Sequence, residues 1–276
     1  MTVLIIGATG FLGTELVRQA ASAGRPAAAT FRSRPGRAPH VPWHHLDLRD
    51  PHGLDAVLGA VEPGVVVNAS SGDADWAVTA DGSVRLARAT AERGIRLLHV
   101  SSDAVFSGSR IHYDETALPD PVTPYGAAKA AGETAVRLLH TDAVVARTSL
   151  VIGDGDSGHE RLVRALATGE RRGVLFTDDV RCPVHVTDLA AALWELSAPG
   201  LTGVVHLAGP DALSRHALGR LIARRDGLDP SLLPAGTRAG SGVPGALDVR
   251  LDGTATRRRL TTVLRGARTF LRPAES

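Results

Sequence analysis

The sequence contains few cysteines, aromatic residues and lysines. Its 276 residues include a single cysteine, Cys182, which excludes a disulfide bond within the chain and is typical of a reducing compartment. Aromatic residues account for 4% of the chain, so alanine, valine and leucine must fill most of the core. No apolar run approaches the ~18 residues of a membrane-spanning helix, and no charged leader precedes the first apolar run. We therefore expect a cytoplasmic protein without a membrane segment.

Strongly charged segments and metal-binding motifs are missing as well. The 31 lysine and arginine residues nearly balance 29 acidic residues, which gives a formal charge of +2. The densest basic cluster, Arg257 to Arg259, has no interleaved aromatic residues, so we expect it to coat a solvated C-terminal helix rather than to bind nucleic acid. His40, His44 and His45 lie close together without the spacing of metal ligands. The sequence thus predicts neither a nucleic-acid partner nor a metal site.

What the chain does contain is a regular alternation of short apolar runs and helical segments. The apolar runs predict buried strands at 3–6, 27–31, 44–48, 64–70, 95–102, 142–148 and 203–209. Helical spacing, with proline starts or glycine stops, predicts helices at 11–24, 51–61, 84–94, 124–139, 160–170 and 186–197. Such alternation is typical of an α/β fold with a doubly wound parallel sheet, the Rossmann arrangement.

The alternation loosens after residue 152, where polar loops and a winding glycine- and proline-rich segment at 228–245 follow. We find no internal repeat. We therefore predict two parts. An NADP-binding Rossmann domain comprises 1–148 plus 184–208, and a smaller discontinuous C-terminal substrate-binding part comprises 149–183 plus 209–276.

The stretch GATGFLG, residues 7–13, follows the first predicted strand and opens the first predicted helix. Gly7 permits a tight turn, Gly10 lets the backbone approach a pyrophosphate, and Gly13 lets the helix pack against the strand. The start of the helix offers unpaired N–H groups to the phosphates. This context predicts a dinucleotide site; the alternative is a glycine-rich turn without a ligand. With the ends of later strands, the predicted cofactor residues of this region are Gly7, Thr9, Gly10, Phe11, Leu12, Gly13, Asp47, Leu48, Ala69, Ser70 and Ser71.

The end of the second predicted strand indicates which dinucleotide binds. NAD sites usually place an acid there to hold the ribose hydroxyls, whereas this chain has TFRSR at 30–34. Arg32 could stack on adenine and bind a 2′-phosphate with Ser33 or Arg34, which predicts NADP(H) in preference to NAD(H). The alternative is a pair of solvated arginines in an arginine-rich chain. Asp47 is either a partner of the adenine amine or a solvated turn carboxylate.

The only lysine of the chain, Lys129, follows Tyr125 by four residues within the helix predicted at 124–139. Both side chains therefore share one helix face. An ammonium ~5 Å from a phenol favours the phenolate by roughly 3 kcal/mol at an effective dielectric of ~20, about two pKa units. We predict that Lys129 lowers the pKa of Tyr125, that Tyr125 is the catalytic acid–base, and that both residues line the cofactor site. The alternative is chance placement.

The stretch HVSSDAVF, residues 99–106, stands at the end of a predicted central strand, the edge at which open parallel sheets bind ligands. Ser102 could hydrogen-bond a substrate carbonyl and align it with Tyr125; the alternative is a serine that only caps the strand. Asp103 either fixes this loop or assists proton transfer. The predicted catalytic residues are therefore Ser102, Tyr125 and Lys129.

With these segments placed, the chain resembles the extended short-chain dehydrogenase/reductase superfamily, and within it the dTDP-4-dehydrorhamnose reductase family. The similar stretches occur in order over about residues 3 to 192: GATGFLG, VVNAS, HVSSDAVFSG, YDETALPDPVTPYGAAKAAGE, ARTSLVIG and DDVRCPVHVTDLA. The resemblance implies a Rossmann fold, a Ser–Tyr–Lys triad at Ser102, Tyr125 and Lys129, and hydride transfer from NADPH to the keto group of a nucleotide-linked sugar. Glu115 and Glu133 fall at motif positions, to which we assign structural roles.

Three positions depart from the family pattern. Ala104 follows Asp103 where the family has a tyrosine, Leu150 replaces a tryptophan, and Asp81 replaces the usual asparagine. The first two positions line the sugar pocket in the family. We therefore expect a substrate pocket at Asp103, Ala104 and Leu150 that is larger, more apolar or differently shaped. The pair Asp103-Ala104 also lacks the glutamate of sugar 4,6-dehydratases, which argues against dehydration.

The function expected from these features is NADPH-dependent reduction of a keto group on a nucleotide-linked deoxysugar, as in a 4-ketoreductase. One alternative is the same reaction on a non-sugar ketone of secondary metabolism. A second is an epimerase, against which the missing acid after the second strand argues. A third is a non-catalytic NADP-binding regulatory subunit, against which the complete triad argues. The expected partners are a small-molecule substrate and no macromolecule beyond a second copy of the chain, as monomer or homodimer.

Overall fold

The central element of the fold is a parallel sheet of seven strands. The computed structural model describes residues 1–273. The strand order is β12-β7-β5-β4-β1-β2-β3, and each neighbouring pair is parallel, which confirms the predicted doubly wound sheet. The chain changes its direction of travel across the sheet between β1 and β4, and open sheets bind ligands at such a point. The strands are β1 (Val3–Ile6), β2 (Ala27–Phe31), β3 (Trp43–His45), β4 (Val65–Asn68), β5 (Arg96–Ser102), β7 (Val144–Thr148) and β12 (Gly203–Leu207).

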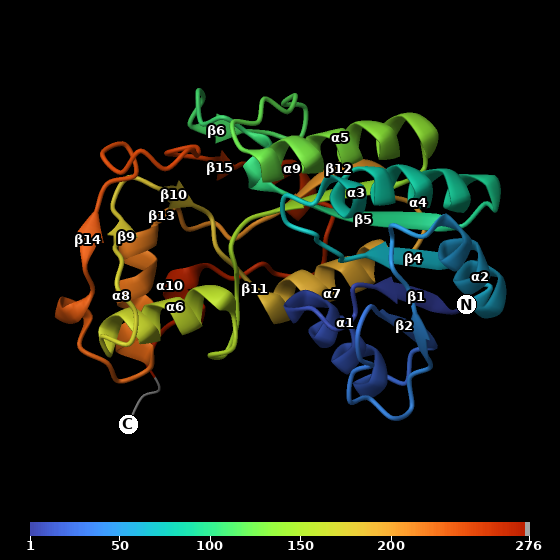
Figure 1. The fold of residues 1–276 in the computed structure, drawn as a ribbon, viewed down its shortest axis with the longest axis horizontal. Coiled ribbons are helices and arrows are strands. Elements are labelled where there is room, and N and C mark those ends of the chain that lie inside the picture. The colour runs from blue at the N-terminus through green and yellow to red at the C-terminus, as the bar shows by residue number, and fades with distance from the viewer. Residues whose placement is uncertain (274–276) are drawn as a thin grey trace.

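Helices cover both faces of this sheet (Figure 1). On one face, α1 (Phe11–Ser22) and α7 (Val186–Leu196) enclose an apolar cluster with the sheet. On the other face, the cluster lies beneath α2 (Pro51–Val61), α4 (Asp81–Glu92) and α5 (Pro124–Leu139). The short helix α3 (Trp76–Thr79) leads into α4. The fully buried strands are apolar on both sides because both faces are covered in this way.

Local signals set the ends of the helices. Thr123 accepts a hydrogen bond from the Gly126 N–H and precedes a proline, so α5 spans 124–139 as predicted. Gly24, with φ of 60°, ends the segment of α1. The strand predicted at 44–48 is misplaced: β3 covers Trp43–His45, and Leu46 and Leu48 are instead buried against the neighbouring helices.

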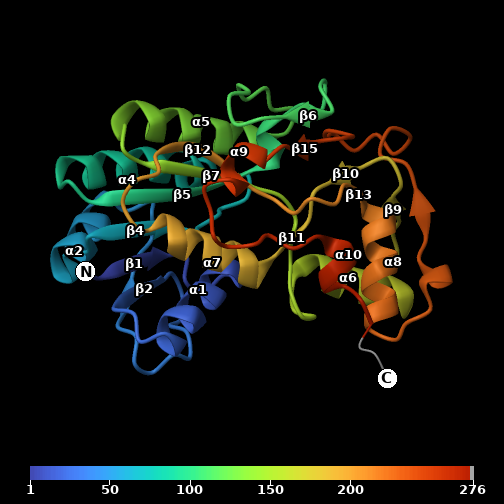
Figure 2. The ribbon, with the colours of Figure 1, turned by 180° about the vertical axis from the view of Figure 1, so that it is seen from behind.

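The remaining segments form a smaller part beside the carboxyl edge of the sheet (Figure 2). Its helices are α6 (Gly158–Ala167), α8 (Arg215–Arg225) and α10 (Ala267–Phe270). They enclose a third apolar cluster. Pairs of two-residue strands connect them: β8 (Val151–Ile152) with β11 (Val184–His185), β9 (Leu175–Phe176) with β14 (Ala235–Gly236), and β10 (Val180–Arg181) with β13 (Leu213–Ser214).

The segment that precedes α5 is also held by distant parts of the chain. After β5 the chain forms the 3-10 turn η1 (Asp103–Val105) and then β6 (His112–Tyr113), which pairs in parallel with β15 (Arg250–Leu251). Two further short elements are η2 (Pro230–Leu232), within the segment predicted to wind irregularly, and α9 (Thr254–Arg257). The basic cluster at 257–259 was predicted to coat a C-terminal helix. Because α9 ends at residue 257, the helix includes only the first arginine of the cluster.

Within residues 1–273, no helix is both long enough and apolar enough to cross a lipid bilayer.

Candidate active site

The glycine-rich turn after β1 has a geometry that only glycine permits. Gly7 has a φ of 77°, and a Cβ there would lie 2.7 Å from the Ser70 Cα. A Cβ on Gly13 would lie 2.2 Å from the Gly7 carbonyl oxygen. The Gly7 N–H donates to Thr30 Oγ1 at 3.2 Å, which ties the turn to the end of β2. The turn is therefore pressed against both neighbouring strands and against α1.

The first turn of α1 is prepared for an anion. Its N-cap is Gly10, which offers no side-chain acceptor to the free N–H groups, and the first turn contains no acidic residue. These N–H groups and the positive end of the helix dipole can therefore bind phosphate oxygens. The arrangement fits the pyrophosphate of a dinucleotide, as the sequence predicts.

A cleft of about 580 Å³ opens above this turn. Of the predicted cofactor residues, the following line it: Gly7, Thr9, Gly10, Phe11, Arg32, Ser33, Arg34, Asp47, Leu48, Ala69, Ser70 and Ser71. Four predicted cofactor residues do not line it: Leu12, Gly13, Tyr125 and Lys129. Gly13 packs against the turn from behind. Sequence reasoning missed the lining residues Ile6, Thr30, Phe31, Leu46 and Val78, although all but Val78 stand at or beside ends of the predicted strands.

The wall of the cleft at the end of β2 is basic. Arg32, Ser33 and Arg34 are exposed there. The acidic residue on this wall is Asp47, and its carboxylate lies 2.6 Å from Arg49 Nη2. Hydrogen bonds from Arg49 lower the pKa of Asp47 to about 2. Asp47 is thus paired at the surface with its neighbour Arg49, and its contact with an adenine stays a prediction.

Lys129 is 4% exposed and points from α5 towards the sheet. Its Nζ donates to the Val100 carbonyl at 3.1 Å and to the Ser70 carbonyl at 3.4 Å, so it reaches the wall of the cleft. Burial lowers the pKa of Lys129 to about 8, while the charges of Glu133 and Asp73 act in the opposite direction. The ammonium is therefore close to losing its proton in the neutral range, yet is still charged at pH 7.

Tyr125 lies half-buried one turn before Lys129 on α5. Burial raises its pKa, and hydrogen bonding with Ser102 and Ser71 acts against that shift. The pKa of Tyr125 is therefore raised and not lowered as predicted, because burial outweighs the favourable contacts, while the effect of Lys129 on this pKa stays a prediction. Hydrogen bonding joins Tyr125 to Ser102 and Ser71, and Lys129 donates to the carbonyl of Ser70, so these residues lie at the carboxyl ends of β4 and β5; their catalytic roles stay a prediction.

Ser102 and Asp103 are fixed by short contacts. Ser102 Oγ accepts a hydrogen bond from the Ala104 N–H at 3.1 Å, so this serine does cap η1. The Asp103 carboxylate is 5% exposed and accepts a hydrogen bond from Ser149 Oγ at 2.6 Å. Of the two roles considered for Asp103, this geometry favours fixing the loop.

Two of the three positions that depart from the family pattern, Ala104 and Leu150, differ in their surroundings. Ala104 is half-buried, and a Cβ on Gly126 would lie 2.1 Å from the Ala104 carbonyl oxygen, so α5 begins in direct contact with η1. Leu150 is buried in the apolar cluster of the smaller part, together with Ile152 and Val163. Its predicted place in a substrate pocket stays a prediction.

Two glutamates with expected structural roles make specific contacts. Glu133, on α5, forms a fully buried ion pair with Arg147, with Nη2 and Oε2 2.8 Å apart. Arg147 also donates to the Ala117 carbonyl at 3.0 Å. Glu115 accepts hydrogen bonds from the N–H and the hydroxyl of Thr256. These contacts attach α5 and the segment before it to the rest of the fold.

A second cavity, of about 230 Å³, lies in the smaller part between α6 and α8. Its walls are mostly apolar, and its polar lining residues are His159, Arg215, Arg238 and Asp179, whose carboxylate is paired with both arginines. The Arg238 guanidinium lies 4.7 Å from the centre of the Phe176 ring. Burial and the nearby Arg215 lower the pKa of His159 to about 4, so this histidine is neutral at pH 7. The cavity combines cations with an aromatic surface.

The fold and the site define a Rossmann-type, nicotinamide-dinucleotide-dependent oxidoreductase. The chain belongs to the family described as the RmlD substrate binding domain, whose model matches residues 1–265. It is 36% identical over 244 residues to a dTDP-4-dehydrorhamnose reductase of Mycobacterium tuberculosis, covering 82% of this chain and 76% of that protein. It is 32% identical over 240 residues to a dTDP-4-keto-6-deoxy-D-glucose reductase of Streptomyces niveus, covering 82% and 79%.

Solved structures share the fold. A dTDP-4-dehydrorhamnose reductase of Bacillus anthracis in complex with NADP superposes with a TM-score of 0.84 at 21% identity, over 98% of this chain and 96% of that chain. The Bordetella bronchiseptica enzyme WbmH in complex with NAD⁺ superposes with a TM-score of 0.83 at 17% identity, over 98% and 95%. The neighbours of this fold thus include complexes with either nicotinamide dinucleotide.

Proposed function

We propose that the protein reduces the keto group of a nucleotide-linked deoxysugar with NADPH, in the manner of a 4-ketoreductase. The observation that carries this proposal is the convergence of Ser102, Tyr125 and Lys129 at the carboxyl edge of the sheet, beside the cleft that fits a dinucleotide. When bound, the nicotinamide supplies a hydride to the carbonyl carbon. The carbonyl oxygen takes the phenolic proton of Tyr125, so the ketone becomes an alcohol.

Each side chain has a separate role in this reaction. The raised pKa of Tyr125 keeps its phenol protonated at neutral pH, as a proton donor must be. Lys129 is charged at pH 7 and stabilises the phenolate that donation leaves behind. Lys129 thus lowers the pKa of Tyr125 relative to what burial alone would give, although not below its ordinary value. Ser102 orients the carbonyl.

A preference for NADP(H) is supported by the basic wall of the cleft. Arg32 and Arg34 are exposed beside the end of β2, where NAD sites usually carry an acid. A guanidinium binds a phosphate through two parallel hydrogen bonds, whereas the ribose hydroxyl of NAD(H) has no negative charge to match it. The two arginines therefore favour the 2′-phosphate of NADP(H).

A nucleotide-linked substrate is supported by the second cavity and by the names of the relatives. Phe176 offers a ring face in this cavity beside the guanidinium of Arg238, and Arg238 and Arg215 are both paired with the buried carboxylate of Asp179. This assignment gives the smaller part, at 149–183 plus 209–276, the substrate-binding role and leaves the cofactor to 1–148 plus 184–208.

Reduction of a non-sugar ketone by the same residues is the second candidate. Ala104 is small and Leu150 is buried among aliphatic residues, so neither offers the aromatic surface that the family uses against a sugar.

The test is NADPH consumption by the purified protein against a panel of dTDP- and UDP-linked 4-keto sugars and simple ketones. Tyr125→Phe should abolish turnover while NADPH binding persists. Tyr113→Phe is the matched control, because Tyr113 is the other tyrosine of the chain and stacks on Phe106 in a separate apolar cluster. Full activity of Tyr125→Phe would refute the mechanism. Tight NADPH binding without turnover of any substrate would favour a regulatory subunit.

A further inference from the structure

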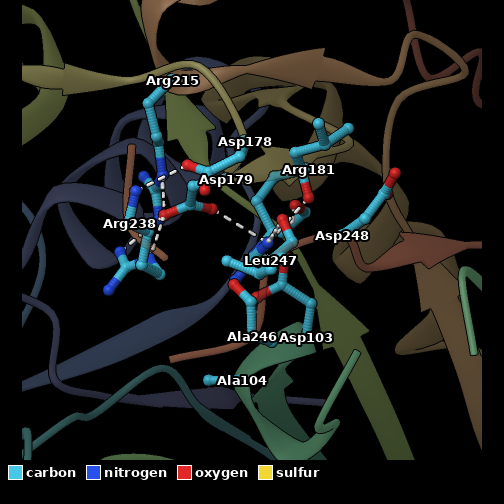
Figure 3. A network of polar contacts seen from close by, with 12 residues as sticks. Asp103, Ala104, Asp178, Asp179, Arg181, Arg215, Arg238, Ala246, Leu247 and Asp248 are labelled. Atoms are coloured by element: carbon cyan, nitrogen blue, oxygen red, sulfur yellow. Dashed lines mark hydrogen bonds and ion pairs between the residues drawn. The ribbon is translucent and has the colours of Figure 1, made fainter. Parts of the chain in front are cut away.

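Asp179, between β9 and β10, carries a fully buried carboxylate among arginines (Figure 3). Its Oδ1 lies 2.9 Å from Arg181 Nη1. Its Oδ2 lies 2.6 Å from Arg238 Nη2 and 3.2 Å from Arg215 Nε. A buried carboxylate requires such partners, because removing its charge from water costs free energy that only ion pairs and hydrogen bonds offset. Asp179 therefore anchors three arginines from β10, α8 and the segment after β14.

Arg181 connects this anchor to the active site. Its Nη1 donates to the carbonyls of Val180 and Leu247, at 2.7 and 3.2 Å, and its Nη2 donates to the carbonyl of Ala246 at 2.8 Å. Its Nε faces Asp103 Oδ2 at 3.6 Å. The guanidinium is thus held by backbone carbonyls, and its two remaining contacts are carboxylates: Asp179, two residues before it, and Asp103, from a distant part of the chain (Figure 3).

The Asp103 carboxylate is held from a second side. Its Oδ2 accepts a hydrogen bond from Ser149 Oγ at 2.6 Å, and Ser149 Oγ accepts one from the Cys182 N–H, next to Arg181, at 3.2 Å. The other oxygen, Oδ1, accepts a hydrogen bond from Ser102 Oγ at 3.4 Å. One carboxylate therefore joins the serine at the end of β5 to the end of β7 and to β10.

We propose that Arg181 is a positioning residue of the active site: it holds the Asp103 carboxylate charged and in place, and Asp103 in turn fixes the hydroxyl of Ser102. The inference rests on the role proposed above for Ser102. Asp103 is then an anchor and not a proton donor, since both of its oxygens already accept hydrogen bonds. The smaller part of the fold contributes to catalysis through this arginine, which approaches Asp103 and not Ser102 itself.

The charged and titratable groups around Asp103 come from several elements. They are Arg181 on β10, Arg215 on α8, Tyr125 on α5, and Cys182. Burial raises the pKa of Cys182 to about 11 and also raises the pKa of Tyr125, so neither is charged at neutral pH. Arg215 acts at longer range. Loss of Arg181 removes the cation nearest to a carboxylate that is 5% exposed, and therefore favours its protonated form.

The kinetic test compares Arg181→Gln with the double variant Asp103→Asn/Arg181→Gln in the full chain. Arg181→Gln should lower kcat on the order of 10²-fold for the 4-keto sugar that the wild type reduces, because the serine loses its fixed position. Its Kd for NADPH should not change. The kcat of the double variant should be at least ~10-fold higher than that of Arg181→Gln, because asparagine at position 103 leaves no buried carboxylate without a cation. Arg220→Gln, an exposed arginine on α8, is the matched control and should behave as the wild type.

A second readout does not depend on activity. Infrared difference spectra at pH 7 should show the carbonyl stretch of a protonated carboxyl in Arg181→Gln, and neither in the wild type nor in the double variant. Absence of this band together with an unchanged kcat would overturn the proposal, as would a double variant no faster than the single one. If Arg181→Gln does not fold, Arg181→Lys replaces it, because lysine keeps the positive charge but lacks the forked donors of the guanidinium. An unchanged kcat in that variant would overturn the proposal.

The two proposals fail in different ways. A wild-type protein that reduces no 4-keto sugar would refute the proposed function, while the infrared comparison would still decide whether Arg181 keeps Asp103 charged. A wild-type protein that is active, with Arg181→Gln equally active, would refute only the positioning role.

Discussion

Replacement of the buried Lys129 by methionine should stabilise the fold while it removes activity. The pKa of this ammonium falls from 10.5 to about 8, chiefly because burial penalises its charge. Each pKa unit corresponds to about 1.4 kcal/mol, so the folded protein carries a penalty of about 3 kcal/mol when the lysine is protonated. Methionine fills a similar volume without a charge. We therefore expect Lys129→Met to raise the free energy of unfolding at pH 7 by up to about 3 kcal/mol.

The pH dependence of this difference has a definite sign. Below pH 8 the lysine is protonated in both folded and unfolded chains, so the wild type bears the full penalty. Between pH 8 and 10.5 the folded chain releases the proton while the unfolded chain keeps it, and the wild type gains stability relative to the variant. Above 10.5 the penalty is gone. Urea denaturation of both proteins across this range measures the difference.

The single lysine makes a direct measurement possible. Protein labelled with ¹³C-lysine gives one side-chain Cε signal, so its shift against pH reports Lys129 alone. Arg137→Met, at an exposed position of the same helix, is the control for removal of a cation from α5 and should not show the pH-dependent difference. A titration midpoint near 10.5, or a stability difference between wild type and Lys129→Met that is flat with pH, would refute the reasoning.

Three further substitutions test other contacts. Gly13→Ala places a Cβ 2.2 Å from the Gly7 carbonyl oxygen and should weaken NADPH binding by at least ~10-fold in a fluorescence titration, with a lower Tm; unaltered binding would contradict the packing argument. Glu133→Gln leaves Arg147 buried without a counter-charge and should cost about 3–5 kcal/mol of unfolding free energy, measured in urea; a loss below ~1 kcal/mol would contradict it. Arg32→Gln should raise KM for NADPH on the order of 10-fold and leave KM for NADH unchanged; equal effects on both would exclude a 2′-phosphate contact.

The sheet and its helices could be predicted because their signals are local. Most strands of the sheet are short apolar runs, and α5 begins at a threonine followed by a proline, so a window of a few residues contained the information. The exception is β3, Trp43–His45, whose position was predicted wrongly. The glycine-rich turn could also be predicted. Gly7 and Gly13 pack against neighbouring segments, and the alternation of strands and helices already implied the order of those segments.

The smaller part could not be predicted in the same way. The strand β9 consists of Leu175 and Phe176, and its partner β14 lies some sixty residues further along, at Ala235 and Gly236, so no local pattern marks either. Helix α8 is rich in arginine and was not predicted at all, since its apolar stripe at Leu218 and Ile222 is short.

The environment of the active site was the least predictable. Tyr125 and Lys129 lie one turn apart on α5, as their spacing predicts, but the direction of the phenol's pKa shift depends on how deeply the fold buries it. The spacing of two residues on one helix does not show how deeply other elements of the fold bury their side chains. For the same reason, the contact between Arg181 and Asp103 could not be found from two segments nearly eighty residues apart.

The pairing of β6 with β15 imposes an order on the maturation of the active site. Residues 112–113, shortly before the helix that carries Tyr125, align with residues 250–251, and Glu115 accepts hydrogen bonds from Thr256. During translation, the glycine-rich turn and its contact with Thr30 are therefore complete early, whereas the segment before α5 gains its contacts with β15 and Thr256 only after residues 250–256 have been made. The nascent chain can form its glycine-rich turn long before this segment has all of its contacts.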